Sequence, residues 1–311
     1  MKIDAVILWV DGNDPVLRER RHKYAPESAF RHSDVAGDTR FANLGEIYWC
    51  VRSLNRFAPF LNKIYIVTDG QDPHISDSTI PIEIVDHKVI FSGYEEYLPV
   101  FNSTAIETVL WRIPGLSEHF LLLNDDFALL RPVGPEDFFT EEGCPICYAD
   151  KFSILWARVL RVLKPHKNGH KVVTFKGKMV NAADIAGWKG WYILYLGHTP
   201  RALLRSEFEN FFSAHPEYIL RNIGSRFRSV TDFQNQELHY LLLLKQGRCK
   251  VVSTRDVLFY MEPKSKPAYI RRKIASLKAG DYKFCCFNSL DQAGAEDRKL
   301  VIDTITGILS E

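Results

Sequence analysis

The chain has 311 residues, of which 46% are hydrophobic, 25% charged and 13% aromatic. This composition excludes a disordered or low-complexity protein, because the apolar side chains are numerous enough to build a full core. No apolar run approaches the roughly 18 residues of a membrane-spanning helix, and Met1 leads directly into an apolar segment without a basic leader. We therefore expect a cytoplasmic protein with reduced cysteines, and the length suits one large domain over residues 1–311 or two small domains.

The net charge of +2 hides an asymmetry between the two halves of the chain. Residues 1–150 hold 13 Lys and Arg and 24 Asp and Glu, a net −11, whereas residues 151–311 hold 27 and 14, a net +13. The basic residues concentrate at 158–178 and 264–278. Such runs suit anionic lipid headgroups or a polyphosphate substrate, or form a solvated surface. They carry no recognisable nucleic-acid-binding module, so we expect no nucleic acid partner.

Apolar runs alternate with helical patterns along the first half of the chain. The runs that predict buried strands are residues 3–10, 63–68, 82–85 and 119–123, and the helical patterns cover 45–57 and 103–112. This order predicts an α/β, Rossmann-like fold with a mostly parallel sheet flanked by helices. Ligands of such sheets bind at the carboxyl ends of the strands.

Acidic clusters follow three of the predicted strands. Their members are Asp11, Asn13 and Asp14; Asp69 and Asp72; and Asp125 and Asp126. No glycine-rich phosphate loop is present, which argues against dinucleotide-binding and P-loop chemistry. Carboxylates at strand ends suit Mg²⁺ or Mn²⁺, which would neutralise the diphosphate of a nucleotide sugar. The alternative is that Asp and Asn simply form the turns.

Four blocks, at residues 3–15, 39–139, 196–206 and 226–247, closely resemble the Stealth family in the same order. They carry the motifs Ala105-Ile106-Glu107 and Asn124-Asp125-Asp126 and the histidine His198. The resemblance implies a GT-A-like version of the α/β fold in a single catalytic domain. It leaves residues 151–195 as a variable insertion and 262–311 as a basic, helical C-terminal segment.

The resemblance implies a hexose-1-phosphate transferase of bacterial capsule or cell-surface polysaccharide synthesis. The enzyme would move a sugar-1-phosphate from a UDP-hexose or UDP-N-acetylhexosamine to a hydroxyl of a saccharide or lipid-linked oligosaccharide, with release of UMP. The alternatives are a conventional GT-A glycosyltransferase that releases UDP, and a non-catalytic scaffold that keeps the fold. The basic half suggests peripheral contact with the anionic inner face of the cell membrane, with residues 264–278 as anchor.

The resemblance assigns catalysis to Glu107, Asp126, His198 and Arg228. Asp126 would be a metal ligand together with Asp125, or a general base, and His198 is a second candidate for that base. Arg228 would clamp the diphosphate, with solvated surface as its alternative.

Glu107 would bind the sugar or the cation. A structural alternative is a capping box over residues 104–107 at a helix start.

Further contacts to the nucleotide sugar are expected from polar residues of the same blocks, namely Asp11, Asn13, Asp14, Arg40, Asn102, Asn124 and Asp232. Residues 231–234 also predict the start of a helix, with Gln234 as its return cap.

Overall fold

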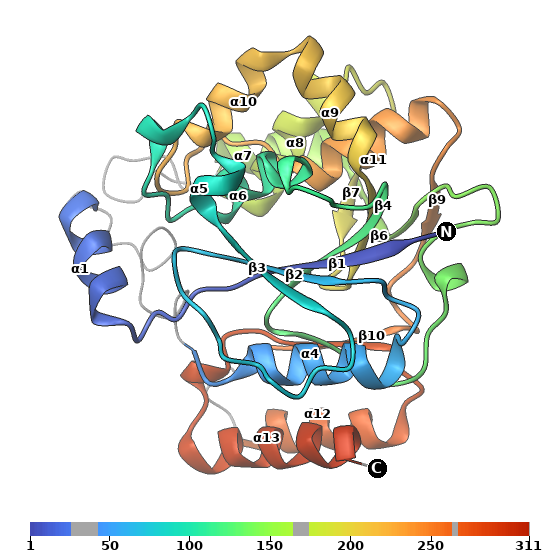
Figure 1. Cartoon of the computed structure of the whole chain (residues 1–311). Helices are drawn as coiled ribbons and strands as arrows, with labels where there is room; N and C mark the ends of the chain where they lie inside the picture. Colours follow the sequence, from blue (N-terminus) through green and yellow to red (C-terminus); the bar gives the residue numbers. More distant parts are fainter. Residues whose placement is uncertain (26–42, 164–173, 263–266, 311) are drawn as a thin grey trace.

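The computed structural model describes residues 1–25, 43–163, 174–262 and 267–310 (Figure 1). Its central sheet has the strand order β3-β2-β1-β4-β8. The strands are β1 (Ile3–Leu8), β2 (Ile64–Thr68), β3 (Ile82–Asp86), β4 (His119–Asn124) and β8 (Arg201–Leu204). β1 to β4 run parallel and β8 pairs antiparallel with β4, which confirms the predicted mostly parallel sheet.

Helices cover both faces of this sheet, which is why its inner strands are mostly apolar. In β1, Ile3, Ala5 and Ile7 pack on one face, and Val6 packs on the other. The first face is covered by α4 (Glu46–Phe57), α12 (Pro267–Ala279) and α13 (Ala295–Ser310), drawn below the sheet in Figure 1. The short helices α5 (His87–Ile90) and α6 (Ser103–Thr108) lie on the second face, while α1 (Pro15–Tyr24) lies at the side.

The predicted helix over 103–112 divides into α6 and a 3₁₀ turn, Leu110–Arg112. The N-cap of α6 is Asn102, whose side chain accepts a hydrogen bond from the amide of Thr104 at 3.2 Å. The alternative of a capping box over residues 104–107 is therefore wrong, because the helix already begins before Thr104. Glu107 is left available for the site described below.

The second half of the chain adds a small sheet of order β7-β6-β9. Its strands are β6 (Ile146–Ser153), β7 (Tyr192–Leu196) and β9 (Lys250–Val252). Between β6 and β7 lie α7 (Ile154–Leu163) and α8 (Phe175–Ile185), which belong to the predicted insertion. α9 (Arg205–Ala214), α10 (Pro216–Ile223) and α11 (Asn235–Lys245) complete the upper layer of Figure 1.

A third sheet joins the middle of the chain to its C-terminal part. β5 (Phe127–Leu129) follows the Asp125-Asp126 pair directly and pairs antiparallel with β11 (Phe284–Phe287), which pairs with β10 (Leu258–Met261). The pairing brings Cys286 opposite Phe127. None of the helices in the described ranges has the length and apolar character needed to cross a bilayer.

Candidate active site

A cavity of about 620 Å³ opens at the carboxyl ends of β1, β2 and β4. Trp9 and Val10 line it after β1, Asp69 after β2, and Asn124 to Asp126 at the end of β4. Its volume is in the range of small-molecule sites, and its place is the one that a parallel sheet offers to ligands.

Three carboxylates lie together in this cavity. Asp125 and Asp126 come from the β4 to β5 turn, and Glu46 comes from the first turn of α4. Burial raises the pKa of all three carboxyl groups, and the charge of Asp126 raises the pKa of Asp125 further. Asp126 also holds a buried Oδ1 that no described group hydrogen-bonds. The carboxylates therefore favour a proton or a cation beside them.

The carboxylates fit a divalent cation that is shared with a substrate. Among the described residues, no group of three or more His, Cys, Asp or Glu side chains is placed to hold a metal ion alone. Mg²⁺ in phosphate sites usually takes one or two carboxylates and completes its shell with phosphate oxygens and water. Asp125 and the unpartnered Oδ1 of Asp126 match this smaller requirement.

His198 lies between β7 and β8 and lines the same cavity. Its Nδ1 is 3.6 Å from Sγ of Cys286, and this thiol donates to Oδ2 of Asp126 at 3.3 Å. The imidazole packs edge-on against Phe127, with ring centroids 6.0 Å apart. Burial, with a smaller effect from Arg201, lowers the pKa of His198 to about 4. The imidazole is therefore neutral near pH 7 and available to accept a proton.

Three cationic side chains line the cavity as well: Lys178 of α8, Arg201 of β8 and Arg228. Lys178 is 5% exposed, and its Nζ donates to Oγ1 of Thr104 at 2.6 Å. Arg201 is 7% exposed and stands over the ring of Phe127 at 5.9 Å. Three buried or half-buried cations in one cavity indicate an anionic ligand.

α6 places the remaining predicted catalytic residue. Glu107 lines the cavity, and its Oε2 is buried without a hydrogen-bond partner in the described part of the chain. The first turn of the same helix contacts two of the cations, since Ser103 accepts from Arg228 at 3.5 Å and Thr104 accepts from Lys178. The helix therefore positions a carboxylate and two cations around one space.

Asn102 and Asp232 are buried but do not line the cavity. Nδ2 of Asn102 donates to Oδ2 of Asp232 at 3.0 Å and to the carbonyl of Ser225 at 3.1 Å, and the amide of Ser229 donates to Oδ2 of Asp232 at 2.9 Å. These bonds fix the segment that carries Arg228 against the start of α6. The two residues thus have a positioning role in the structure, and ligand contact stays a prediction for them.

The predicted helix start at residues 231–234 is wrong by a few residues, because α11 begins at Asn235. Gln234 is the N-cap, and its side chain makes no capping hydrogen bond; it donates to Oε1 of Gln236.

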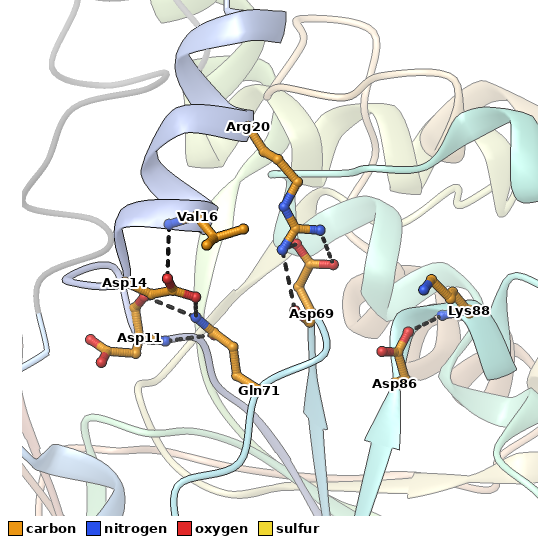
Figure 2. Close-up of polar contacts among 8 residues, drawn as sticks. All are labelled: Asp11, Asp14, Val16, Arg20, Asp69, Gln71, Asp86 and Lys88. Atoms are coloured by element: carbon orange, nitrogen blue, oxygen red, sulfur yellow. Dashed lines mark hydrogen bonds and ion pairs between the residues drawn. The ribbon is translucent and has the colours of Figure 1, made fainter.

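The residues of the acidic turn after β1 are not among those that line the cavity. Asp14 caps α1 by accepting from the amide of Val16 at 2.8 Å, and it also accepts from Nε2 of Gln71 at 2.9 Å (Figure 2). Asp11 caps the amide of Asn13, and Nδ2 of Asn13 donates to a loop carbonyl. These residues shape the turn, as the structural alternative proposed. A ligand contact by any of them stays a prediction.

In the next acidic cluster, Asp69 and Asp72, only one residue forms a turn. Arg20 pairs with Asp69 at 3.1 Å, and Asp69 lines the cavity (Figure 2). Asp72 caps the amide of His74. Arg40, a further predicted phosphate ligand, lies outside the described residues.

Glu46, Lys178 and Arg201 line the cavity and were not among the predicted site residues, and neither was Cys286, which contacts Asp126 and His198. Arg201 lies three positions after His198 in the block at 196–206, so its place in that block was a usable signal. Lys178 lies in the predicted insertion, and no motif distinguishes it from the other lysines there.

The chain matches two family models, described as Stealth protein conserved region 1 over residues 1–29 and conserved region 2 over residues 40–146. The chain belongs to the Stealth family. These matches contain the first block and nearly all of the second. The blocks at 196–206 and 226–247 stay predictions.

This Stealth protein is 34% identical over 289 residues to an exopolysaccharide phosphotransferase of Streptomyces coelicolor, covering 92% of the chain and 47% of the relative. It therefore spans about half of that relative's length. It is also 29% identical over 316 residues to capsular polysaccharide phosphotransferase WcwK of Streptococcus pneumoniae, covering 96% of the chain and 93% of WcwK.

Among solved structures, the apo form of the bifunctional glycosyltransferase WbbM shares the fold. The TM-score is 0.51 at 10% identity, with 98% of this Stealth protein and 49% of WbbM covered. The GT-A-like α/β fold expected from the sequence is thereby confirmed.

Proposed function

We propose that this Stealth protein transfers a sugar-1-phosphate from a UDP-hexose or UDP-N-acetylhexosamine to a hydroxyl of a saccharide. The observation that carries the proposal is one cavity that His198, with its lowered pKa, shares with carboxylates and cations. The phosphotransferase names of the relatives support the same reaction class and a role in capsule or exopolysaccharide synthesis.

In the proposed donor complex, Lys178, Arg201 and Arg228 hold the diphosphate, since guanidinium and ammonium groups form charge-assisted bonds to phosphate. Asp125 and Asp126 would hold a Mg²⁺ or Mn²⁺ ion, which when bound supplies positive charge to the phosphate oxygens. Glu107, whose Oε2 has no partner in the described part of the chain, accepts hydrogen bonds from hydroxyls of the donor sugar.

In the proposed transfer, His198 takes the proton of the acceptor hydroxyl. The freed oxygen forms a bond to the phosphorus that carries the sugar, and the bond from this phosphorus to the bridging oxygen breaks. UMP leaves with that oxygen, and its charge stays beside the cationic side chains. Cys286 orients the imidazole from the Nδ1 side.

The nucleotide product tests the proposal against its main alternative. Purified protein would be incubated with UDP-sugars and a saccharide acceptor, and the released nucleotide would be separated by chromatography while ³¹P NMR follows the product. UMP together with a phosphodiester resonance is expected. UDP would instead identify a conventional glycosyltransferase, and the absence of any nucleotide product with a broad panel of donors and acceptors would favour a non-catalytic role.

The proposed setting is the inner face of the cell membrane, where a lipid-linked oligosaccharide would serve as acceptor. The basic second half of the chain supports attraction to anionic lipid. Of the predicted anchor at 264–278, residues 264–266 lie outside the described part. In the remainder, Ile270, Ile274 and Leu277 of α12 are buried in the core.

A further inference from the structure

α7 exposes an apolar stripe on its outer side. Leu155, Trp156, Val162 and Leu163 are exposed by 70%, 56%, 82% and 69%. Their positions i, i+1, i+7 and i+8 lie on one side of a helix. Trp191, which is 66% exposed, lies beside the start of α7, because its carbonyl accepts a hydrogen bond from the amide of Ile154 at 3.0 Å. We call these five residues the α7 surface.

This stripe is not the face that attaches α7 to the domain. Ala157, on another side of the helix, is 3% exposed, and α7 packs there against α8 and β6. α7 is therefore apolar on two sides, and the domain covers one of them. An exposed apolar stripe that contains tryptophan is typical of a surface that meets a partner.

The charges near the α7 surface are mostly positive. Lys151 and Lys189 are exposed, Arg158 is exposed and pairs with Asp184 at 2.5 Å, and no Asp or Glu occurs in the sequence between Asp150 and Asp184. Lys151 stands 4.8 Å from the ring of Tyr192, whose centroid is 5.3 Å from that of Trp191. The combination matches an anionic bilayer, in which tryptophan prefers the interface and lysine reaches the headgroups.

We propose that the α7 surface docks on an anionic lipid bilayer, with α7 lying in the plane of the interface. Apolar side chains alone would also suit a protein partner, but the neighbouring positive charges favour the membrane. α12 is less suited to this task, since its apolar face already packs in the core.

The strand β7, which packs against α7, reaches the rim of the cavity. Lys176 contacts the ring of Phe152 at 3.7 Å and that of Tyr195 at 5.4 Å, while Phe175 packs edge-on against Tyr195 at 6.0 Å. Phe175 and Tyr195 both line the cavity. If the proposed function holds, docking therefore brings a lipid-linked acceptor to the side of the cavity that contains Lys178.

The test is co-sedimentation with vesicles at low salt. Wild type, the double variant Trp156→Ser/Trp191→Ser and the control Val16→Ser would each be mixed with vesicles of phosphatidylcholine and phosphatidylglycerol, or of phosphatidylcholine alone. Val16 is a matched control because it is 58% exposed on α1. Circular dichroism melts verify that all three proteins are folded.

We expect wild type and control to bind the anionic vesicles, and the double variant to bind them about tenfold or more weakly. Equal binding by the double variant, or no binding by wild type, would overturn the proposal. If light scattering shows a wild-type dimer that the double variant loses, without vesicle binding by either, the surface is an interface between copies.

Activity assays separate this proposal from the proposed function. The double variant should keep full UMP release with a water-soluble acceptor and lose it about tenfold with an acceptor embedded in vesicles. If wild type releases no nucleotide, the proposed function fails, and sedimentation still decides the membrane surface.

Discussion

The cations that line the cavity come from the second half of the chain, and most of the carboxylates come from the first. The first half provides Glu46, Asp69, Glu107, Asp125 and Asp126, and the second half provides Lys178, Arg201 and Arg228 together with Glu262 and Asp291. The acidic half forms the parallel sheet, whose strand ends place carboxylates by local sequence. The basic half delivers its cations from α8, β8 and the loop before α11. The charge asymmetry of the sequence is thus partly a division between the two sides of one site.

The two sides also differ in how they are held. The carboxylates are crowded, with pKa values raised by burial, so they gain most from an added cation. Two of the cations are held by side chains of α6, which belongs to the acidic half. A nucleotide diphosphate with a divalent ion would complement both sides at once.

The largest expected effect comes from the acidic side. Asp126→Asn should lower turnover by about 10³-fold or more, since it weakens metal binding and removes a buried charge beside the phosphates. Chelation should abolish UMP release, and calorimetry should detect Mn²⁺ binding that strengthens when the UDP-sugar is present.

The control for this experiment is Asp77→Asn, in the loop between β2 and β3. Asp77 is exposed and does not line the cavity, so turnover of this variant should stay within about threefold of wild type. Full activity after exhaustive chelation would remove the metal from the mechanism.

Substitutions at His198 and at Arg228 should impair the enzyme in different ways. His198→Ala should leave donor affinity nearly intact and lower kcat by about 10²–10⁴, the usual contribution of a general base. Arg228→Ala should also weaken UDP-sugar binding, because a contact to the diphosphate already exists in the ground state. Calorimetric affinities compared with kcat decide the point. Loss of donor binding in a folded His198→Ala protein would make this histidine a phosphate ligand.

Substitution of Cys286 distinguishes the two candidate general bases, His198 and Asp126. The variant Cys286→Ala should lower kcat by only about tenfold. His198 must be neutral to accept a proton, so with a pKa of about 4 it should sustain kcat/KM from neutral pH down to about pH 5. Burial raises the pKa of Asp126 and the hydrogen bond from the Cys286 thiol offsets part of that rise, whereas the lowered pKa of His198 comes from burial and Arg201. In Cys286→Ala the acid limb should therefore stay in place if His198 sets it. An upward shift of that limb would assign it to Asp126.

The smallest effect on turnover is expected from the hydrogen bonds of Asn102, which hold the segment that carries Arg228 against the start of α6. Asn102→Ala removes the N-cap of α6 and a donor to the buried carboxylate of Asp232. The free energy of unfolding should fall by about 2–3 kcal/mol, as measured by urea denaturation. The exposed Asn13→Ala should change it by less than about 0.5 kcal/mol. Equal stability of the two variants would show that Asn102 does not hold the Arg228 segment against α6.

The sequence by itself determined the central sheet and its acidic edge. Continuous apolar runs predicted β1, β2 and β4 within two residues, because a strand that is buried on both faces must be apolar throughout. Asp125 and Asp126 follow such a strand directly, so their place in the cavity is a local consequence of the chain. The helix at 45–57 was equally clear, since its apolar face repeats at helical spacing.

The tertiary structure decided which distant residues complete the site. Cys286 reaches Asp126 because β11 pairs with β5, a contact between segments about half the chain apart that no local pattern encodes. Lys178 enters the cavity because the position of α8 lets it donate to Thr104 on another helix. Local periodicity specifies which segments form strands and helices, but burial and pairing between distant segments decide which side chains meet. In the sequence, the cationic side of the cavity therefore appears mainly as an excess of Lys and Arg in the second half of the chain, and the tertiary structure determines which of these residues reach the cavity.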